Sequence, residues 1–146
     1  MRTLVRLALV AATVAPLTAP AQLPILTLNA GIHLIHAEVA NTFDARMTGL
    51  MHRKTLGAGN GMLFVFPHAS VQCMWMRNTF VPLSVAFIDE GGVILNIADM
   101  KPQTEDSHCS TAPVRYALEM NQGWFAGKGI KPGAKISGIE KAPAPR

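Results

Sequence analysis

The sequence has few of the features that would indicate a nucleic-acid-binding protein, a membrane-spanning protein or an enzyme with a familiar motif. Only 15% of its 146 residues are charged, and the net charge of +4 is too small to favour nucleic acid or an anionic membrane as a partner. After residue 21, no apolar run approaches the roughly 20 residues that a spanning helix needs. No HExxH, CxxC or GxSxG motif and no phosphate-binding glycine loop occurs. We therefore expect no cofactor, no bound metal and no nucleic-acid partner.

The first 21 residues have the three parts of a secretory signal peptide. Two arginines lie near the start, residues 7–17 are almost wholly apolar, and residues 19–21 (APA) have the small-x-small form of a cleavage site. No cysteine lies at that site, so a lipid anchor is not expected there. We predict that the signal peptide is removed, that the mature protein begins near Gln22, and that it is periplasmic with no membrane span.

Short apolar runs separated by turn residues fill the rest of the chain, and this pattern favours strands over helices. The eight predicted strands cover residues 25–29, 32–40, 61–66, 71–78, 83–89, 92–100, 115–121 and 135–140. The clearest hairpin surrounds Glu90-Gly91, because glycine accepts the positive φ of tight hairpin turns. Residues 22–140 are predicted to form a single mainly-β (α+β) domain. We expect an antiparallel β-sandwich or barrel of about seven or eight short strands, with one short helix packed on it. Residues 141–146 have nothing to bury and are predicted to be a disordered tail.

Residues 41–54 break the strand pattern and are predicted to form a helix capped by Thr42 or its neighbour Asn41. Its apolar residues would form a narrow stripe suited to packing on a sheet. They are Phe43, Met47, Leu50 and Met51. Gly49 would cost such a helix about 1 kcal/mol relative to alanine, so we expect its backbone to approach another element closely. A second short helical turn is expected within residues 122–128.

The two cysteines of an exported domain are most simply explained by a disulfide, because the compartment is oxidising. Cys73 and Cys109 are 36 residues apart, and closing that loop is worth about 3–4 kcal/mol in the chain-entropy account. The alternative is a copper site with soft sulfur and imidazole ligands. Its candidate ligands are Cys73, Met74, Met76, His108 and Cys109. The other histidines are interpreted as structural or solvent-exposed: His33, His36, His52 and His68.

Five stretches of the chain together resemble one bacterial and archaeal family, the domain of unknown function 192. They are residues 46–53 (RMTGLMHR), 61–66 (GMLFVF), 74–83 (MWMRNTFVPL), 87–93 (FIDEGGV) and 116–123 (YALEMNQG). The family patterns are arginine-x-x-GLM-x-arginine, GMLF-x-F, WM-(K/R)-NT-x-x-PL, FID-x-x-G and VLE-x-x-x-G. The resemblance runs in order from about Ile25 to Ile139. It implies a small, mainly-β, often exported domain of unknown function.

Ser84 departs from this pattern, because the family commonly has an aspartate directly after the PL pair. If that aspartate were a catalytic acid in relatives, this chain would have lost it. The surrounding motif is kept without the carboxylate, which favours a structural or binding role for this region.

The same segments carry the residues that could form a site: Arg46, Arg53, Trp75, Asn78, Thr79 and Glu119. In a structural interpretation, Glu119 lies in an apolar strand, needs a partner and pairs with Arg46 or Arg53. Asn78 and Thr79 would then bond turn backbone and hold the helix on the sheet. Replacing Glu119 by alanine would cost about 3–5 kcal/mol, because it would leave a cation unpaired. In the other interpretation, these groups line a cleft that holds an oxygen-rich ligand against Trp75.

Three functional hypotheses follow from these residues. The first is a non-catalytic binding or accessory domain of the cell envelope, whose ligand is a small oxygen-rich molecule or an envelope fragment. The second is a cell-envelope hydrolase that uses Glu119 as its general acid or base. The third is a periplasmic copper-handling protein. We favour the first, because no serine or cysteine has a visible base beside it.

Overall fold

Most of the chain folds into one curled β-sheet with a small two-stranded ribbon and two short helices. The computed structural model describes residues 22–146, so the predicted signal peptide lies outside the described residues. The elements are β1 (Ile25–Ala30), β2 (His33–Ala40), α1 (Phe43–Thr48), β3 (Asn60–Ser70), β4 (Cys73–Met74), β5 (Leu83–Ile88), β6 (Ile94–Met100), β7 (His108–Cys109), β8 (Val114–Asn121), α2 (Trp124–Gly127), β9 (Ile136–Ser137) and the 3₁₀ turn η1 (Ile139–Lys141). The predicted mainly-β class is confirmed. No helix within residues 22–146 is long and apolar enough to cross a membrane.

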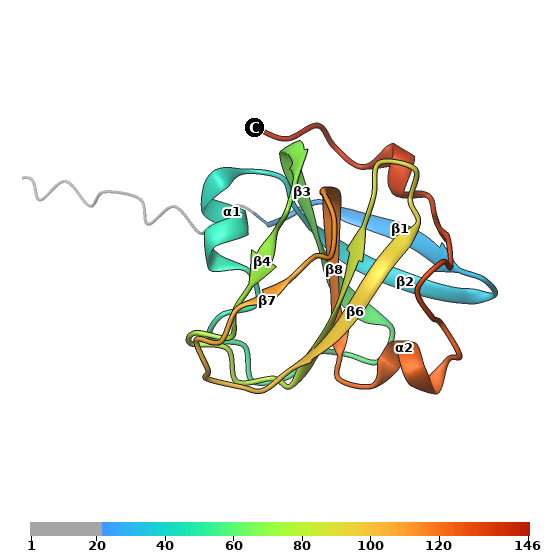
Figure 1. Ribbon diagram of the computed structural model, residues 1–146. Coiled ribbons are helices and arrows are strands. Elements are labelled where there is room, and N and C mark those ends of the chain that lie inside the picture. The colour runs from blue at the N-terminus through green and yellow to red at the C-terminus, as the bar shows by residue number, and fades with distance from the viewer. Residues whose placement is uncertain (1–21) are drawn as a thin grey trace, which may run out of the picture.

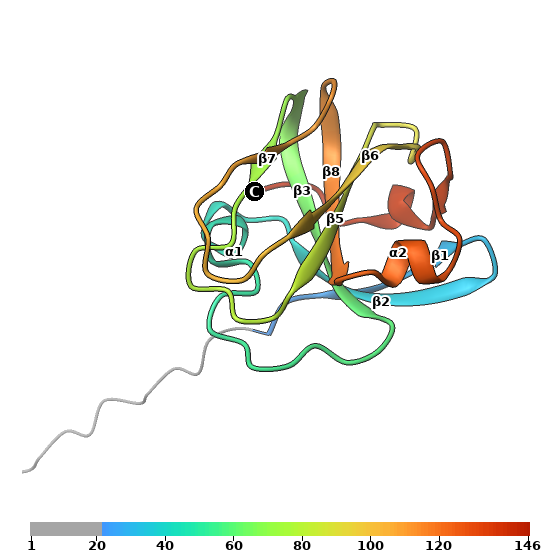
Figure 2. The same cartoon turned by 60° about the horizontal axis from the view of Figure 1, so that its bottom comes forward.

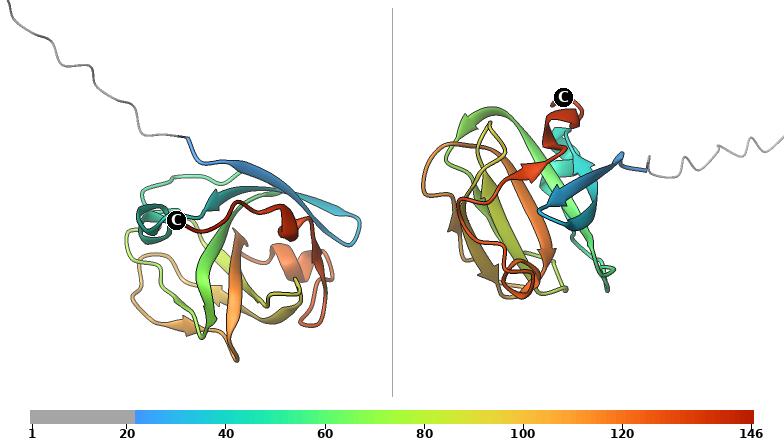
Figure 3. Two further views of the ribbon diagram at one scale, coloured as in Figure 1. Left: turned by 90° about the horizontal axis from the view of Figure 1, so that it is seen from above. Right: turned by 90° about the vertical axis from the view of Figure 1, so that its right-hand side faces the viewer.

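The seven-stranded sheet has the order β6-β5-β8-β3-β2-β1-β9, and it curls until its two edges meet (Figure 1 and Figure 3). Backbone bonds join the edges: Ile94 donates to the Ala134 carbonyl at 2.9 Å, and Ile136 donates to the Gly92 carbonyl at 2.8 Å. The β5–β6 hairpin forms around Glu90-Gly91 as predicted. One pair departs from the expected antiparallel pattern, because β2 and β3 are parallel. Parallel neighbours need a crossover, and residues 41–59, which include α1, supply it.

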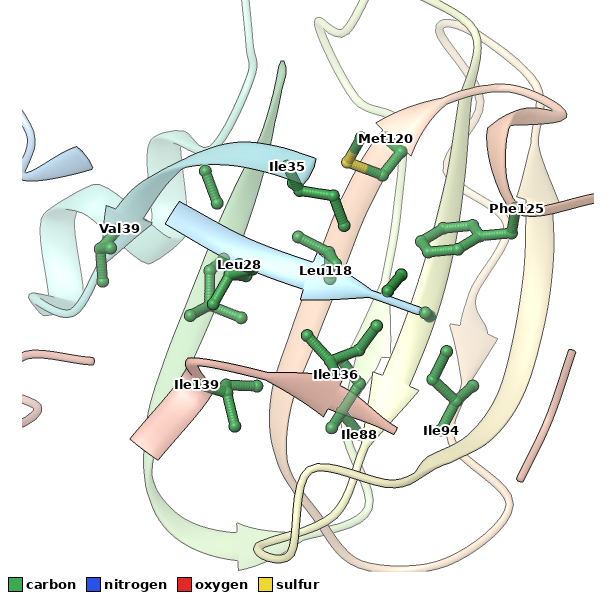
Figure 4. Close-up of a cluster of buried hydrophobic side chains, with 14 of the residues drawn as sticks. Leu28, Ile35, Val39, Ile88, Ile94, Leu118, Met120, Phe125, Ile136 and Ile139 are labelled. Atoms are coloured by element: carbon green, nitrogen blue, oxygen red, sulfur yellow. The ribbon is translucent and has the colours of Figure 1, made fainter. Parts of the chain in front are cut away.

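Both faces of the central strands are buried, because the curl and the loops cover the sheet on two sides. In β3, Leu63 and Val65 belong to one core, while Met62 and Phe64 belong to the other. The first core lies between β1, β2, β8 and the segment around β9, where its side chains converge (Figure 4). The second includes Leu50, which follows α1, and Met76, which follows β4; α1 and the β4–β7 ribbon are seen in Figure 1 and Figure 2. A strand buried on both faces reads as a continuous apolar run, as residues 61–66 do.

The predicted disulfide is confirmed. Cys73 and Cys109 lie opposite each other in the β4–β7 ribbon and are bonded to each other. With both sulfur atoms in that bond, neither is available as a thiolate ligand, and Met76 is fully buried in the second core. Among the described residues, no group of three His, Cys, Asp or Glu side chains is placed to hold a metal ion.

Helix α1 is shorter than predicted, and its apolar stripe does not pack on the sheet. The Thr42 hydroxyl accepts from the Ala45 amide at 3.1 Å, so the predicted cap is confirmed, but the helix ends at Gly49 after one and a half turns. Phe43 is 66% exposed and Met47 is 51% exposed. The expectation that these side chains cover the sheet is therefore wrong, because the chain turns away before the stripe can be buried. Of the four stripe residues, only Leu50, beyond the helix, is buried.

Gly49 occupies a conformation that other residues rarely adopt, and we expect its replacement by alanine to be destabilising. Its φ is +50°, and an added Cβ would lie 3.2 Å from Cζ of Phe64, which is the predicted close approach. The combined backbone strain and contact should cost about 1–3 kcal/mol. Urea unfolding of Gly49→Ala measures the loss, and Gly127→Ala is the matched control because its added Cβ meets open space. Equal stability of the two variants would contradict this interpretation.

The end of the chain runs back across the molecule to the start of the crossover. The Asn41 side-chain amide donates to the Ala144 carbonyl at 2.7 Å, and the Arg146 amide donates to the Asn41 carbonyl at 2.6 Å. The structure thus gives residues 141–146, expected to be a disordered tail, defined contacts. The predicted turn at residues 122–128 is present as α2.

Candidate functional site

A pocket of about 270 Å³ opens between α1, the segment around β4 and the sheet, and we call it the Glu119 pocket. Its polar lining side chains are Arg46, Thr48, Gln72, Thr79 and Glu119. Its aromatic lining side chains are Phe43, Phe64, Phe66 and Trp75, and its methionines are Met47, Met51 and Met74. Mostly apolar walls with a few converging polar groups are the usual composition of a small-molecule site.

Glu119 is the buried ionisable group of this pocket. It lies in β8, where its cross-strand neighbours are Met62 of β3 and Val85 of β5. Its residue is only 4% exposed, and within residues 22–146 its carboxyl makes no ion pair and no hydrogen bond. Every fully enclosed polar side-chain atom in the described chain has a hydrogen-bond partner, so the unpaired Glu119 oxygens keep an opening to the pocket. Burial raises the pKa of Glu119 to about 8.

The predicted pairing of Glu119 with an arginine is wrong, because both arginines have other partners. Arg53 forms a two-pronged ion pair with Glu38 of β2, with Nη1–Oε1 at 2.5 Å and Nη2–Oε2 at 2.7 Å. This hydrogen-bonded pair raises the pKa of Arg53. Arg46 donates from Nη1 to the Val65 carbonyl at 3.1 Å, next to an irregularity in the β3–β8 register. The spacing of the two arginines in the sequence gave no indication that Arg53, in the crossover, would lie beside Glu38 of β2.

We expect the Arg53–Glu38 pair to fasten the crossover to β2 with a coupling energy of about 1 kcal/mol. The geometry favours a strong pair, but both side chains are about one-third exposed, so solvent weakens it. A double-mutant cycle with Arg53→Gln, Glu38→Gln and the combined variant measures the coupling by urea unfolding. It should shrink in 1 M salt. A coupling of zero at low salt would show that the contact does not stabilise the fold.

The structure brings four of the six predicted site residues to the pocket: Arg46, Trp75, Thr79 and Glu119. Arg53 and Asn78 are not among the lining residues. Asn78 has a φ of +52°, a value that asparagine tolerates better than most residues, and its carbonyl accepts from the His52 amide at 2.8 Å. This bond is made by the backbone of Asn78 and not by its side chain, so the predicted side-chain bond of Asn78 to turn backbone is not found among the described residues. The Thr79 hydroxyl does donate to backbone, to the Arg77 carbonyl at 3.1 Å.

Several lining residues were not predicted from the sequence, because their patterns are typical of the core or of other roles. Phe43 and Met47 were placed on the sheet, and Met74 was considered only as a copper ligand. All three line the pocket instead. The spacing of Phe43 and Met47 did indicate that their side chains lie together, since residues four apart on a helix share a face. What the sequence could not show is that this face remains open.

Ser84 lies on the other face of the sheet from Glu119, next to a second hollow. Its hydroxyl donates to Oδ1 of Asp99 at 2.5 Å and accepts from the Gly123 amide at 2.9 Å. The side-chain oxygen of residue 84 thus accepts a hydrogen bond from the backbone of a second motif segment, at Gly123. The side chain of either a serine or an aspartate has an oxygen that can accept this bond. Ser84 takes no part in the Glu119 pocket, because the two residues lie on opposite faces of the sheet.

The chain belongs to the DUF192 family, described as an uncharacterized ACR, because the model of that family matches residues 25–138. This confirms the resemblance found in the sequence motifs. No curated protein matches the chain significantly.

Two solved structures have the same fold and moderate sequence identity. One is a proposed transcription regulator from Sinorhizobium meliloti 1021, with a TM-score of 0.79 and 31% identity, covering 83% of this chain and 98% of that chain. The other is a protein of unknown function from Novosphingobium aromaticivorans, with a TM-score of 0.76 and 34% identity, covering 82% of this chain and 93% of that chain. The likeness extends over nearly the whole described fold.

Proposed function

We propose that this protein is an exported, non-catalytic binding domain of the cell envelope that takes up a small molecule in the Glu119 pocket. One observation carries the proposal: the carboxyl of Glu119 is buried without a partner and opens into a pocket. A carboxyl that is largely desolvated and has no protein partner can gain a hydrogen bond from a ligand in the pocket. A structural carboxyl of the same strand would be expected to have a protein partner.

Trp75 allows this proposal to be tested directly, because it lines the pocket and the sequence contains only two tryptophans. In a Trp124→Phe background, fluorescence reports Trp75 alone. Small carboxylates, sugars and soluble envelope fragments would be titrated, and the melting temperature would be recorded in parallel. A true ligand at 100 times its Kd should stabilise the fold by about 2.7 kcal/mol. If no compound changes Trp75 emission or the melting temperature, the binding proposal fails.

The export part of the proposal rests on residues 1–21 alone. Expression of the full chain in a bacterium, followed by intact mass measurement of the periplasmic fraction, should give a protein that begins at Gln22. Recovery of the protein only in the cytoplasm, or with residues 1–21 retained, would contradict it.

A hydrolase is the second candidate, because a carboxyl that is protonated at neutral pH is suited to general-acid catalysis. The pKa of about 8 for Glu119 provides that protonation. In this case the wild type should hydrolyse envelope glycan or peptide fragments, and Glu119→Gln should abolish turnover. The binding proposal expects no turnover in either protein while ligand binding persists.

A further inference from the structure

The Glu119 pocket offers hydrogen-bond donors and one fixed positive charge. Arg46 and Glu119 are the two ionisable side chains among its lining residues, apart from the disulfide-bonded Cys73. Arg46 uses one N–H on the Val65 carbonyl, and a guanidinium has five. A protonated Glu119 carboxyl contributes an O–H donor. These donors call for a ligand oxygen, and the arginine favours one with negative charge.

Apart from Arg46, Glu119 and three neutral polar side chains (Thr48, Gln72 and Thr79), the pocket is lined by apolar side chains, and that part of its wall is unsuited to a ligand that is polar throughout. Leu50, Phe64 and Phe66 are buried in the second core and form its inner wall, and Trp75 lies at the mouth with 40% exposure. A sugar would bury several hydroxyls against these side chains without partners, which is costly. A ligand with an apolar body and a single polar head group fits a pocket that has Arg46 and Glu119 on one part of its lining and apolar side chains on another.

The volume limits the size of that body. An apolar cavity of about 150 Å³ holds one benzene molecule, and the Glu119 pocket measures about 270 Å³. The space is sufficient for one aromatic ring or a short alkyl chain together with a small head group.

We infer that the Glu119 pocket binds a monocarboxylate carried on a single aromatic ring or a short alkyl chain. This inference rests on the proposed binding function. The ligand carboxylate accepts from the Glu119 O–H and from the free N–H groups of Arg46, and its apolar body lies against Phe64, Phe66 and Trp75. A cationic ligand is disfavoured, because it would be placed beside Arg46.

Three compounds of nearly equal shape test which charge the pocket prefers in a ligand's head group. They are phenylacetate (negative), phenylacetamide (neutral) and 2-phenylethylamine (positive). Each would be titrated at pH 6.5 into the Trp124→Phe protein, with Trp75 emission as the readout. Phenylacetate should bind at least tenfold more tightly than the amide, and the amine should not bind. Tighter binding of the amide, of the amine or of a sugar would overturn the inference while leaving the binding proposal intact. If none of these compounds and none of the broader screen binds, both fail.

Variants at Arg46 test the charge separately from the fold. Arg46→Gln should weaken phenylacetate binding at least tenfold and leave the amide within about threefold, and Arg46→Lys should restore part of the loss. Lys54→Gln is the matched control, because it removes the same charge from an exposed residue outside the lining. Equal weakening by Lys54→Gln and Arg46→Gln would overturn the inference. Melting curves identify any variant that has not folded, and Arg46→Lys then carries the test.

Discussion

Glu119→Gln should make the protein more stable at neutral pH, by about 3 kcal/mol at pH 7, and should change little at pH 4. Folding raises the pKa of Glu119 from 4.5 to about 8 through desolvation. Below pH 4.5 the carboxyl is protonated in both the folded and the unfolded chain. Between pH 4.5 and pH 8, the Glu119 carboxyl is ionised in the unfolded chain and protonated in the folded protein. Stability is therefore lost as the pH rises from 4.5 to 8, and glutamine, which does not titrate, avoids this loss.

The measurement is urea unfolding of the wild type and Glu119→Gln between pH 4 and pH 9. The difference between them should grow with pH and level off above pH 8, with a higher melting temperature for the variant by roughly 10 °C at pH 7. Glu90→Gln is the matched control, because it changes an exposed turn carboxylate. If Glu119→Gln were less stable than the wild type at every pH, Glu119 would have a favourable partner, and the structural interpretation from the sequence would be restored.

Removing the disulfide should destabilise the protein by about 3–4 kcal/mol, because the bond closes a loop of 36 residues in the unfolded chain. Strands β4 and β7 have only two residues each, so their own pairing cannot replace the crosslink. The double variant Cys73→Ser/Cys109→Ser should thus unfold at markedly lower urea than the oxidised wild type. It should also weaken binding at the Glu119 pocket, since Cys73, Met74 and Trp75 form part of its wall.

The reduced wild type is the control for the serine substitutions. Both cysteines are exposed, so a reductant should reach the bond in the folded protein and reproduce the loss seen in the double variant. Thiol labelling of the denatured, unreduced wild type should find no free cysteine. Two labelled thiols, or equal stability of the oxidised and reduced proteins, would contradict this account.

The sequence predicted the local elements well, because turn residues and short apolar runs report directly on nearby backbone. The β5–β6 hairpin, the Thr42 cap, the Cys73–Cys109 bond and the close approach at Gly49 are all found in the structure. The parallel β2–β3 pair was not predicted, because a period-2 pattern is the same in parallel and antiparallel neighbours.

The candidate site was predicted only in part, because its character depends on contacts distant in sequence. The residues flanking Glu119 correctly indicated burial, but its partner was inferred from the motif arginines, and Arg53 pairs with Glu38 instead. The stripe of Phe43 and Met47 was assigned to the core, because amphipathic spacing shows which side chains share a face and not what that face meets. The pocket was therefore not predicted. One prediction gave Glu119 an arginine partner within the fold, and the other buried Phe43 and Met47 against the sheet.

The central claim is that Glu119 is a neutral, unpaired carboxyl at the Glu119 pocket near pH 7, and carbon-13 NMR of its side-chain carboxyl tests this most directly. The resonance is assigned by comparison with Glu119→Gln and followed from pH 3 to pH 10. The account predicts a titration midpoint at a pKa of about 8, moved upward when phenylacetate is bound beside it. A midpoint near 4.5 would contradict it, because the carboxyl would then be ionised and compensated within the folded protein.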